Sequence, residues 1–288
     1  MVSTAQTIPP ANLLTEALSS WISNGVSDGL YIVSMDHAPS EQLTGLGWHT
    51  TVLVLSPAVE HAELAQRLGS RLKPRNPGLS KWVNATRAYR QAFLSRFTSE
   101  LEQFPGVAVL AVSATEATIE ASLPHFISNL GLETHYSRMG NGHVSLGPFV
   151  RGSDREERTV QLSEKRAAMC LFIAHFVRRM HAQMYEAANR DCLDDPGHMN
   201  WNFYGDKFPG PRNGDMELMF QVLMGVDRSR GRIQWGYFTE GGQQEIDLLV
   251  DNLAGALNVA VERSYSPQGK GGLFYWERWS GPIRIPLK

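Results

Sequence analysis

The feature that most constrains the fold is an apolar run from Leu30 to Met35, which carries no charged side chain. Such a run is typical of a strand buried on both faces of a sheet. Segments of strand type alternate with segments of helix type along the rest of the chain. The sequence predicts further strands at 48–55, 107–112, 199–204 and 233–238, and helices at 11–27, 57–72, 81–104, 116–130, 163–189, 215–224 and 245–263. This alternation predicts an α/β domain with a mixed sheet flanked by helices.

Composition limits the classes of protein to which the chain can belong. Of its 288 residues, 42% are hydrophobic and 19% are charged, which suits a globular protein with a substantial core. The formal net charge is −2, so contact with nucleic acid has to rest on local basic patches. We find no Walker loop, dinucleotide fingerprint, zinc spacing or nucleophile elbow. Their absence disfavours a metabolic α/β enzyme that uses a cofactor.

Three further features predict a cytoplasmic protein with no membrane span. The N-terminal residues lack the basic and apolar regions of a secretory signal. The longest apolar stretch, 167–177, is shorter than the ~20 residues that cross a bilayer and is followed by Arg178, so we expect a buried helix. The two cysteines, Cys170 and Cys192, form no close-spaced motif, as is usual in a reducing compartment.

Three aspartates lie at or near the ends of apolar segments that are far apart in the sequence. Asp36 follows the first predicted strand, Asp206 follows the strand 199–204, and Asp251 lies in the last predicted helix. One fold can gather acids from strand ends and from a helix beside the sheet, and carboxylate oxygens are the ligands that Mg²⁺ prefers. Each aspartate also has a structural alternative, because Asp commonly begins turns and lines solvated helix faces.

The last predicted helix, 245–263, is amphipathic. A row of polar residues flanks its apolar stripe at helical spacing, and its members are Asp247, Asp251, Asn258 and Glu262. This spacing puts Asp251 at the edge of the buried face, from which it can approach a strand end. Asp247 is expected to be more exposed. The alternative is that the whole row marks the solvent boundary of the helix.

The order of these segments, with the sequence Val-Asp-Asn-Leu-Ala-Gly-Ala-Leu at 250–257, resembles a known family. It is a widespread domain-of-unknown-function family of bacteria and phages (the one numbered 3800) with an RNase H-like fold. In that family, Asp-Glu-Ser-Gly ends the first strand, an Asp ends a mid-chain strand, and a helix carries Asp followed by leucine-isoleucine-alanine-glycine-alanine. The resemblance implies an RNase H-like domain at 28–264, preceded by a helical segment at 1–27 and followed by an aromatic tail at 265–288.

The chain departs from the family pattern at several positions. His37 stands where the family has a glutamate after its first aspartate, and Leu248 replaces a glutamine before the last one. The pair Lys81-Trp82 resembles a helix start that carries a glutamate in the family, whereas Leu79 and Ser80 precede it here. Three of the four expected acids are therefore present.

The resemblance implies a metal-dependent nuclease that hydrolyses phosphodiester bonds with metal-bound water. It implies that Asp36, Asp206 and Asp251 bind Mg²⁺ or Mn²⁺ and take part in catalysis. The polar row on the last helix adds Asp247 as a weaker ligand candidate. His37 is a candidate for shuttling a proton or orienting the substrate, although a histidine at a strand end is more often a hydrogen-bonded loop residue.

Two segments mix cations with aromatic residues, as nucleic-acid contacts do. One is the loop with Arg228, Arg230 and Arg232, and the other is the tail with Trp276 and Trp279. Their structural alternatives are a solvated turn and an aromatic strand that packs on the core or on a partner.

A different class of function is also open to this chain. A catalytically degraded RNase H-like protein could serve as a structural or recognition subunit of a larger assembly in phage defence or mobile-element biology. The missing glutamate after Asp36 favours that alternative, while the retention of Asp36, Asp206 and Asp251 favours the enzyme. The sequence leaves open a protein partner or a homo-oligomer.

Overall fold

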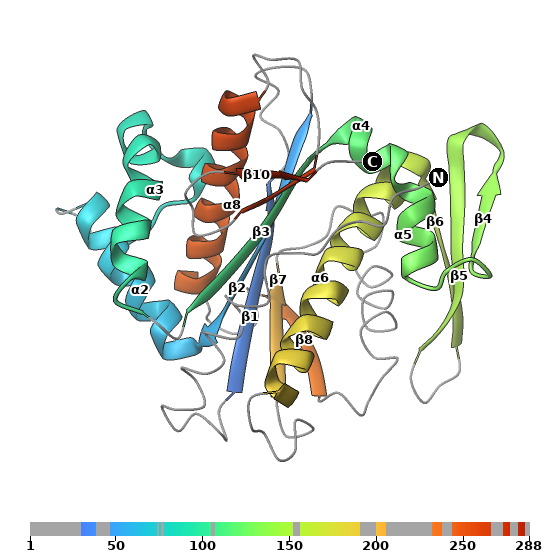
Figure 1. Cartoon of the computed structure of the whole chain (residues 1–288), viewed down its shortest axis with the longest axis horizontal. Coiled ribbons are helices and arrows are strands. Elements are labelled where there is room, and N and C mark those ends of the chain that lie inside the picture. Colours follow the sequence, from blue (N-terminus) through green and yellow to red (C-terminus); the bar gives the residue numbers. More distant parts are fainter. Residues whose placement is uncertain are drawn as a thin grey trace.

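The structure is a computed structural model of the chain, with a mixed α/β architecture. It describes residues 30–38, 47–73, 75, 78–104, 107–151, 156–190, 200–205, 232–237, 244–265, 273–276 and 282–285. A large sheet lies between two groups of helices (Figure 1). One group contains α2 (Ala58–Leu72), α3 (Arg87–Leu101) and α8 (Gln244–Tyr265). The other contains α4 (Glu116–Ala121), α5 (Leu123–Asn129) and α6 (Glu164–Arg190).

The large sheet has seven strands in the order β10-β9-β3-β2-β1-β7-β8. The strands are β1 (Leu30–Ala38), β2 (Trp48–Pro57), β3 (Ala108–Thr115), β7 (Asn200–Gly205), β8 (Arg232–Tyr237), β9 (Leu273–Trp276) and β10 (Pro282–Ile285). The pairs from β10 through β9, β3 and β2 to β1 are antiparallel, whereas β1–β7 and β7–β8 are parallel. Two strands of the C-terminal tail therefore extend the edge formed by β3.

The side chains of β2 alternate between the two faces of the sheet, as the period of a strand requires. Trp48, Val52 and Val54 are buried in one core together with apolar residues of the first helix group, among them Leu64, Leu68, Phe93, Phe97, Leu249, Leu253 and Leu257. Burial of each such side chain contributes about 1.5–3 kcal/mol. Helix α8 packs directly on β1 and β2, so its position is fixed against the middle of the sheet.

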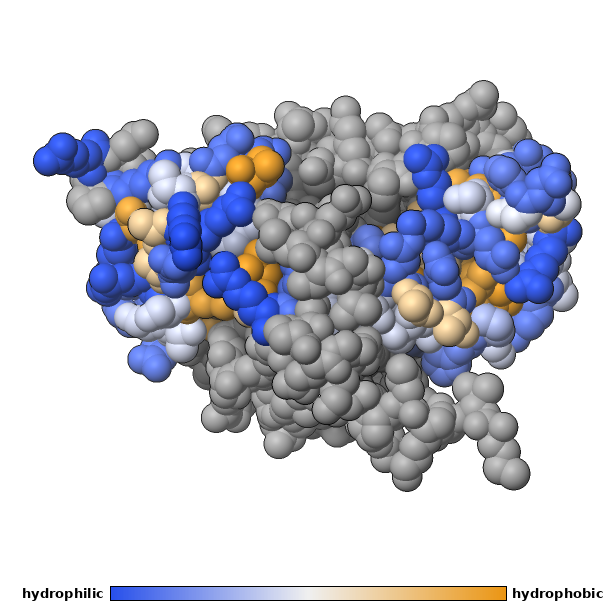
Figure 2. Space-filling view, turned by 90° about the horizontal axis from the view of Figure 1, so that it is seen from above, coloured by the Kyte–Doolittle hydropathy of each residue, from blue (hydrophilic) through white to orange (hydrophobic). Residues whose placement is uncertain are grey.

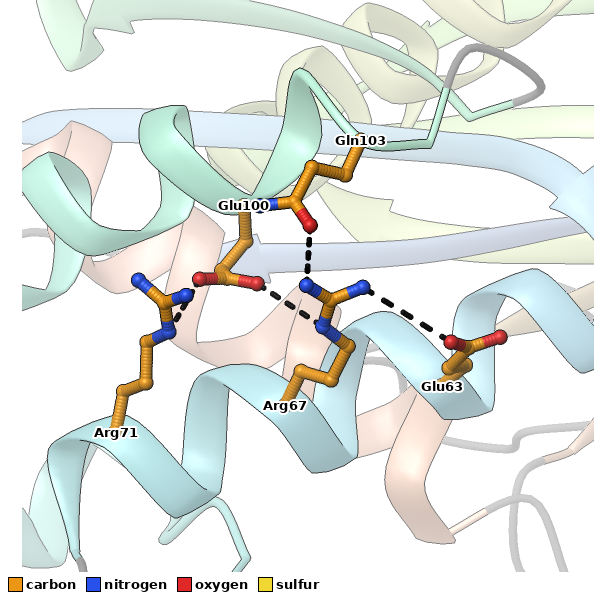
Figure 3. A network of polar contacts seen from close by, with 5 residues as sticks. All are labelled: Glu63, Arg67, Arg71, Glu100 and Gln103. Atoms are coloured by element: carbon orange, nitrogen blue, oxygen red, sulfur yellow. Dashed lines mark hydrogen bonds and ion pairs between the residues drawn. The ribbon is translucent and has the colours of Figure 1, made fainter.

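Helix α2 is tied to α3 by a buried carboxylate (Figure 3). The side chain of Glu100 in α3 has no exposed surface. Its Oε2 lies 3.2 Å from Nε of Arg67, and its Oε1 lies 2.5 Å from Nε of Arg71. Arg67 also donates to Gln103 and lies 4.0 Å from Glu63. The negative charge of Glu100 is thus compensated by two arginines from the neighbouring helix.

The predicted helix 81–104 is wrong at its start. The structure has a short 3-10 helix, η2 (Trp82–Asn84), before α3 begins at Arg87. Ala85 is extended, and the Oγ1 of Thr86 accepts a hydrogen bond from the backbone N–H of Tyr89 at 3.3 Å. Threonine is a favoured N-cap, so the helix starts after Thr86 and leaves η2 as a separate element.

The predicted helix 116–130 is divided into α4 and α5. Ser122 lies between them, with φ −89° and ψ 0°, and Pro124 stands in the first turn of α5. Proline is favoured there because it has no N–H to satisfy, so it begins a new helix in place of continuing the previous one.

A second sheet has the order β4-β5-β6. Strands β4 (Tyr136–Met139) and β5 (His143–Arg151) form a hairpin around η3 (Gly140–Gly142), where Asn141 has φ +65°. Strand β6 (Glu156–Ser163) was not predicted, because its charged first half lacks an apolar alternation. No helix in the described part of the chain is long and apolar enough to cross a membrane.

Candidate functional site

The polar row on α8 is not a solvent boundary. Asn258 and Glu262 are 2% and 1% exposed, and Asp247 and Asp251 are half-buried. The alternative of a solvated flank is therefore wrong for the C-terminal half of the row.

Asn258 anchors α8 to the sheet through a buried polar group. Its Oδ1 accepts a hydrogen bond from the hydroxyl of Thr50 at 2.9 Å, and Thr50 Oγ1 lies 2.7 Å from Ser113 Oγ. Thr50 is in β2 and pairs with Ala38, at the C-terminal end of β1. The contact therefore fixes α8 beside the end of β1 where Asp36 lies. Because all three side chains are buried, losing one partner would leave a costly unsatisfied group.

Asp251 and Asn252 hold the segment that precedes α3. One oxygen of Asp251, Oδ2, accepts a hydrogen bond from the backbone N–H of Trp82 at 2.6 Å. Nδ2 of Asn252 donates to the carbonyl of Ser80 at 2.6 Å and to that of Leu248 at 2.7 Å. Two consecutive residues of α8 thus bind both sides of residue 81, and an ionised acceptor makes the first of these bonds a strong one.

The indole ring of Trp82 packs on α8 where the helix has a glycine. A Cβ built on Gly255 would lie 2.3 Å from Cδ1 and Cγ of Trp82, so only glycine permits this approach. The other sides of the ring meet Phe93, edge to face at 6.2 Å between centroids, and the guanidinium of Arg90, at 5.1 Å. Arg90 also donates to the carbonyls of Trp82 and Val83, both at 3.0 Å.

The charge of Asp251 affects a neighbouring phenol. Tyr89 lies 3.4 Å from the backbone nitrogen of Ser80, which donates to its hydroxyl oxygen. Burial is the main cause that raises the pKa of Tyr89 to about 12, the hydrogen bond from Ser80 lowers it, and the Asp251 carboxylate adds a further increase. The charge of Asp251 therefore acts on η2 and on the start of α3.

The backbone register brings the end of β7 beside Met35 of β1, so that Asp36 lies within β1 and not after it as predicted. Met35 pairs with Gly205, the last residue of β7. Asp36 follows Met35 in the chain, and Asp206 follows Gly205 but lies outside the described residues. On the other side of β1, Asp36 pairs with Val52 and His37 with Thr51.

The predicted acids are thus only partly described. Asp251 and Asp247 are placed on α8 with their side chains, whereas Asp36 and His37 are placed by the backbone of β1. Within the described residues, no group of three or more His, Cys, Asp or Glu side chains is arranged to hold a metal ion. Asp206 is not among the described residues.

Most of the residues predicted to contact nucleic acid lie outside the described residues. Arg228, Arg230 and Trp279 fall outside the described residues. Arg232 is the first residue of β8, and Trp276 is the last residue of β9, where it pairs with Pro282 of β10. A strand at Trp276 agrees with the structural alternative for the tail.

Sequence reasoning missed the contacts that organise this site. It did not predict that Asn252 and Trp82 join η2 to α8, or that Asn258 bonds to Thr50. One signal was present, because Lys81-Trp82 was already singled out by the family resemblance. Nothing in the sequence pairs that dipeptide with Gly255, since their contact spans more than 170 residues.

No protein-family model matches the chain, and no curated protein matches it.

Proposed function

We propose that this protein is a metal-dependent nuclease with an RNase H-like fold, in which Asp36, Asp206 and Asp251 hold Mg²⁺ or Mn²⁺. The observation that carries the proposal is the pairing of Met35 with Gly205. Each of these residues immediately precedes one of the proposed ligands, and the two strands run parallel. The carboxyl ends of adjacent parallel strands meet at one edge of a sheet, which is a common location for binding sites.

The strand order supports the RNase H-like part of the proposal. In such a sheet the first three strands are consecutive and antiparallel, and a fourth and fifth strand continue in parallel from the first. The central order β3-β2-β1-β7-β8, with its pairing directions, agrees with that arrangement. Helix α8, which carries Asp251, packs on β1 and β2.

The surroundings of Asp251 suit a metal ligand. Carboxylates that bind metals are usually oriented by a hydrogen bond from a second group, and here the Trp82 N–H supplies it at 2.6 Å. A bound Mg²⁺ or Mn²⁺ would supply charge stabilisation at the scissile phosphate and an activated water. Asp247, one turn earlier on α8, is the weaker candidate for a further ligand, and His37 would orient the substrate or carry a proton.

A catalytically degraded RNase H-like protein is the second candidate function. The observation that favours it is the replacement of the family glutamate by His37, next to Asp36. With one ligand fewer, metal occupancy and turnover fall, since loss of groups around a metal commonly costs 10–100-fold in affinity or activity. Such a protein would act as a structural or recognition subunit of a larger assembly.

Cleavage assays distinguish these two functions. The purified protein would be incubated with labelled single- and double-stranded DNA and RNA in Mg²⁺, Mn²⁺ or chelator. We expect weak cleavage that is strongest in Mn²⁺, absent in chelator, and lost in Asp36→Asn and Asp251→Asn. Glu102→Gln is the matched control, because it neutralises an exposed carboxylate at the end of α3 and should cleave like the wild type.

Two results would contradict the nuclease proposal. Equal cleavage by wild type and Asp36→Asn would point to a contaminant or to a different site. No cleavage with any metal, together with a partner that copurifies in a fixed ratio, would favour the structural subunit.

A further inference from the structure

A long segment of the chain carries only positive charge. Residues 64–99 contain eight Lys or Arg and no Asp or Glu, although the whole chain has a net charge of −2. The segment runs from α2 through η2 into α3. Hydrophilic residues cover much of the described surface at this end of the molecule, with hydrophobic residues between them (Figure 2).

Not all of these cations are available to a ligand. Arg67 and Arg71 face Glu100, whose charge they balance. Arg75 follows the end of α2, and Arg96 lies later in α3. Four other cations, Lys73, Lys81, Arg87 and Arg90, lie on or next to η2 and are called the η2 cluster below.

The η2 cluster is held together by contacts with η2 and the start of α3. Lys73 donates to the hydroxyl of Ser80, and its Nζ lies 5.7 Å from the ring centre of Tyr89. Arg90 donates to two carbonyls of η2 and covers the indole of Trp82. Arg87 lies one turn before Arg90, on the same flank of α3.

Lys81 is the member nearest to the proposed active site. Its two neighbours are bound to α8, Ser80 through Asn252 and Trp82 through Asp251, both at 2.6 Å. The backbone of Lys81 is therefore fixed beside the Asp251 carboxylate while its side chain is exposed. Neither Lys81 nor Arg87 forms an ion pair with any residue that the structure describes.

We propose that the η2 cluster binds the phosphodiester backbone of a nucleic acid and leads it past Asp251. The inference rests on the proposed nuclease function and names the surface that would hold its substrate. The four cations lie on a segment that itself carries no acid, and such a group attracts a polyanion and releases its counterions on binding. Lys81 would contact a phosphate close to the one that is cleaved.

The cluster is suited to phosphates and not to bases. The aromatic side chains around it are all buried, with Trp82 6%, Tyr89 4% and Phe93 0% exposed. Stacking of bases needs an exposed ring, so these residues offer none. Contacts made only to phosphates position a nucleic acid without reading its sequence. We therefore expect binding that is strongly dependent on salt and nearly independent of sequence.

The test is a binding titration with the double variant Lys81→Ala/Arg87→Ala. Fluorescently labelled duplex DNA, its single strand and the matching RNA serve as probes, in chelator so that no cleavage occurs. Each lost phosphate contact lowers the salt slope of log K by about 0.9 on duplex DNA. For two contacts at 0.1 M salt, this slope corresponds to roughly 60-fold weaker binding.

A matched double variant, Arg138→Ala/Arg166→Ala, controls for net charge. It removes the same number of exposed cations near β4 and the start of α6, at the opposite end of the molecule from α3 (Figure 1). We expect its affinity and salt slope to stay within about twofold of the wild type, because screened charges at a distance contribute little. Both variants change exposed residues, and circular dichroism would be used to check that they fold.

The binding titration separates this inference from the nuclease proposal. Loss of binding in the η2 variant alone supports the surface, whether or not the wild type cleaves. Equal losses in both double variants, or no loss in either, would overturn it. Binding to phosphatidylserine vesicles that depends on Lys81 and Arg87, with no binding to any nucleic acid, would overturn it too.

Discussion

Replacing Gly255 by alanine should destabilise this protein, although the same change in most helices does the opposite. In the middle of a helix, alanine is favoured over glycine by up to ~1 kcal/mol because it loses less backbone entropy on folding. Gly255 lies inside α8, so propensity alone predicts a more stable protein. The structure predicts the reverse sign because of Trp82.

The magnitude follows from the contact distance. The new Cβ would lie 2.3 Å from two ring atoms of Trp82, whereas ordinary contact begins at 3.4 Å. The indole would have to retreat by about 1 Å, and Phe93 and Arg90 occupy the space behind it. Overpacking of this kind costs about 1–3 kcal/mol. If the backbone also shifts, the bond from Trp82 to Asp251 weakens, and a bond to a charged group is worth about 1.5–3 kcal/mol.

Subtracting the helix gain, we expect the free energy of unfolding to fall by roughly 2–4 kcal/mol. Urea unfolding followed by circular dichroism measures it, with the denaturant slope checked for constancy. The same change is then made in a second variant, Trp82→Leu, in which a smaller side chain leaves room for the added methyl group. There, Gly255→Ala should cost little or become favourable, giving a coupling energy above about 1.5 kcal/mol.

Additive effects of Gly255→Ala and Trp82→Leu would refute this reasoning. So would a stabilised Gly255→Ala protein with an unchanged tryptophan fluorescence spectrum, since the ring would then have no contact with the new methyl group. Either result would also remove the argument that the glycine of the family-like segment 250–257 exists to receive Trp82.

Two further predictions concern buried ionisable groups. His61 is fully buried, and burial lowers its pKa from 6.5 to about 3; below pH 6.5 the unfolded chain takes up a proton that the folded one does not. The free energy of unfolding should therefore fall by up to about 1.4 kcal/mol per pH unit as the pH drops from 6.5 towards 4. Urea unfolding at a series of pH values measures this fall, and the free energy of unfolding of His61→Gln should depend less steeply on pH. For Glu100, the double variant Arg67→Met/Arg71→Met should cost about 3–5 kcal/mol, because it leaves a buried charge uncompensated. Glu100→Gln should cost less, since the arginines can turn to solvent, and the opposite order in chemical denaturation would contradict the ion-pair account of Figure 3.

The central elements could be predicted from sequence because their patterns are strong. The apolar run of β1, the β-branched residues of β2 and the amphipathic stripe of α8 each match one secondary structure and no other. The strand β6 was missed because its first half is charged, and the start of α3 was placed too early because Thr86 was not recognised as its N-cap. The period of apolar residues carries no information about charged strand residues or about N-cap side chains.

The site was harder to predict than the fold because its contacts join distant segments. Asp251 was expected at the edge of a buried face and is half-buried on α8. Its partner is a backbone N–H, which leaves no trace in the sequence. The burial of Glu262 was likewise unexpected, because a glutamate at the flank of an amphipathic helix is normally solvated. Nearly every residue carries a backbone donor and acceptor. Only the folded structure therefore shows which of them a given side chain binds.

The pairing of β1 with β7 also determines when this protein can fold during its synthesis. One partner of β1, β2, is nearby in the chain. The partner on its other edge, β7, begins only at Asn200. At typical elongation rates, the ribosome needs roughly 10–30 s to make the intervening chain. Through that interval an apolar strand keeps one edge open to pairing with other nascent chains. The central sheet therefore closes late in translation, and chains released before β7 are the ones that chaperones and proteases would have to remove.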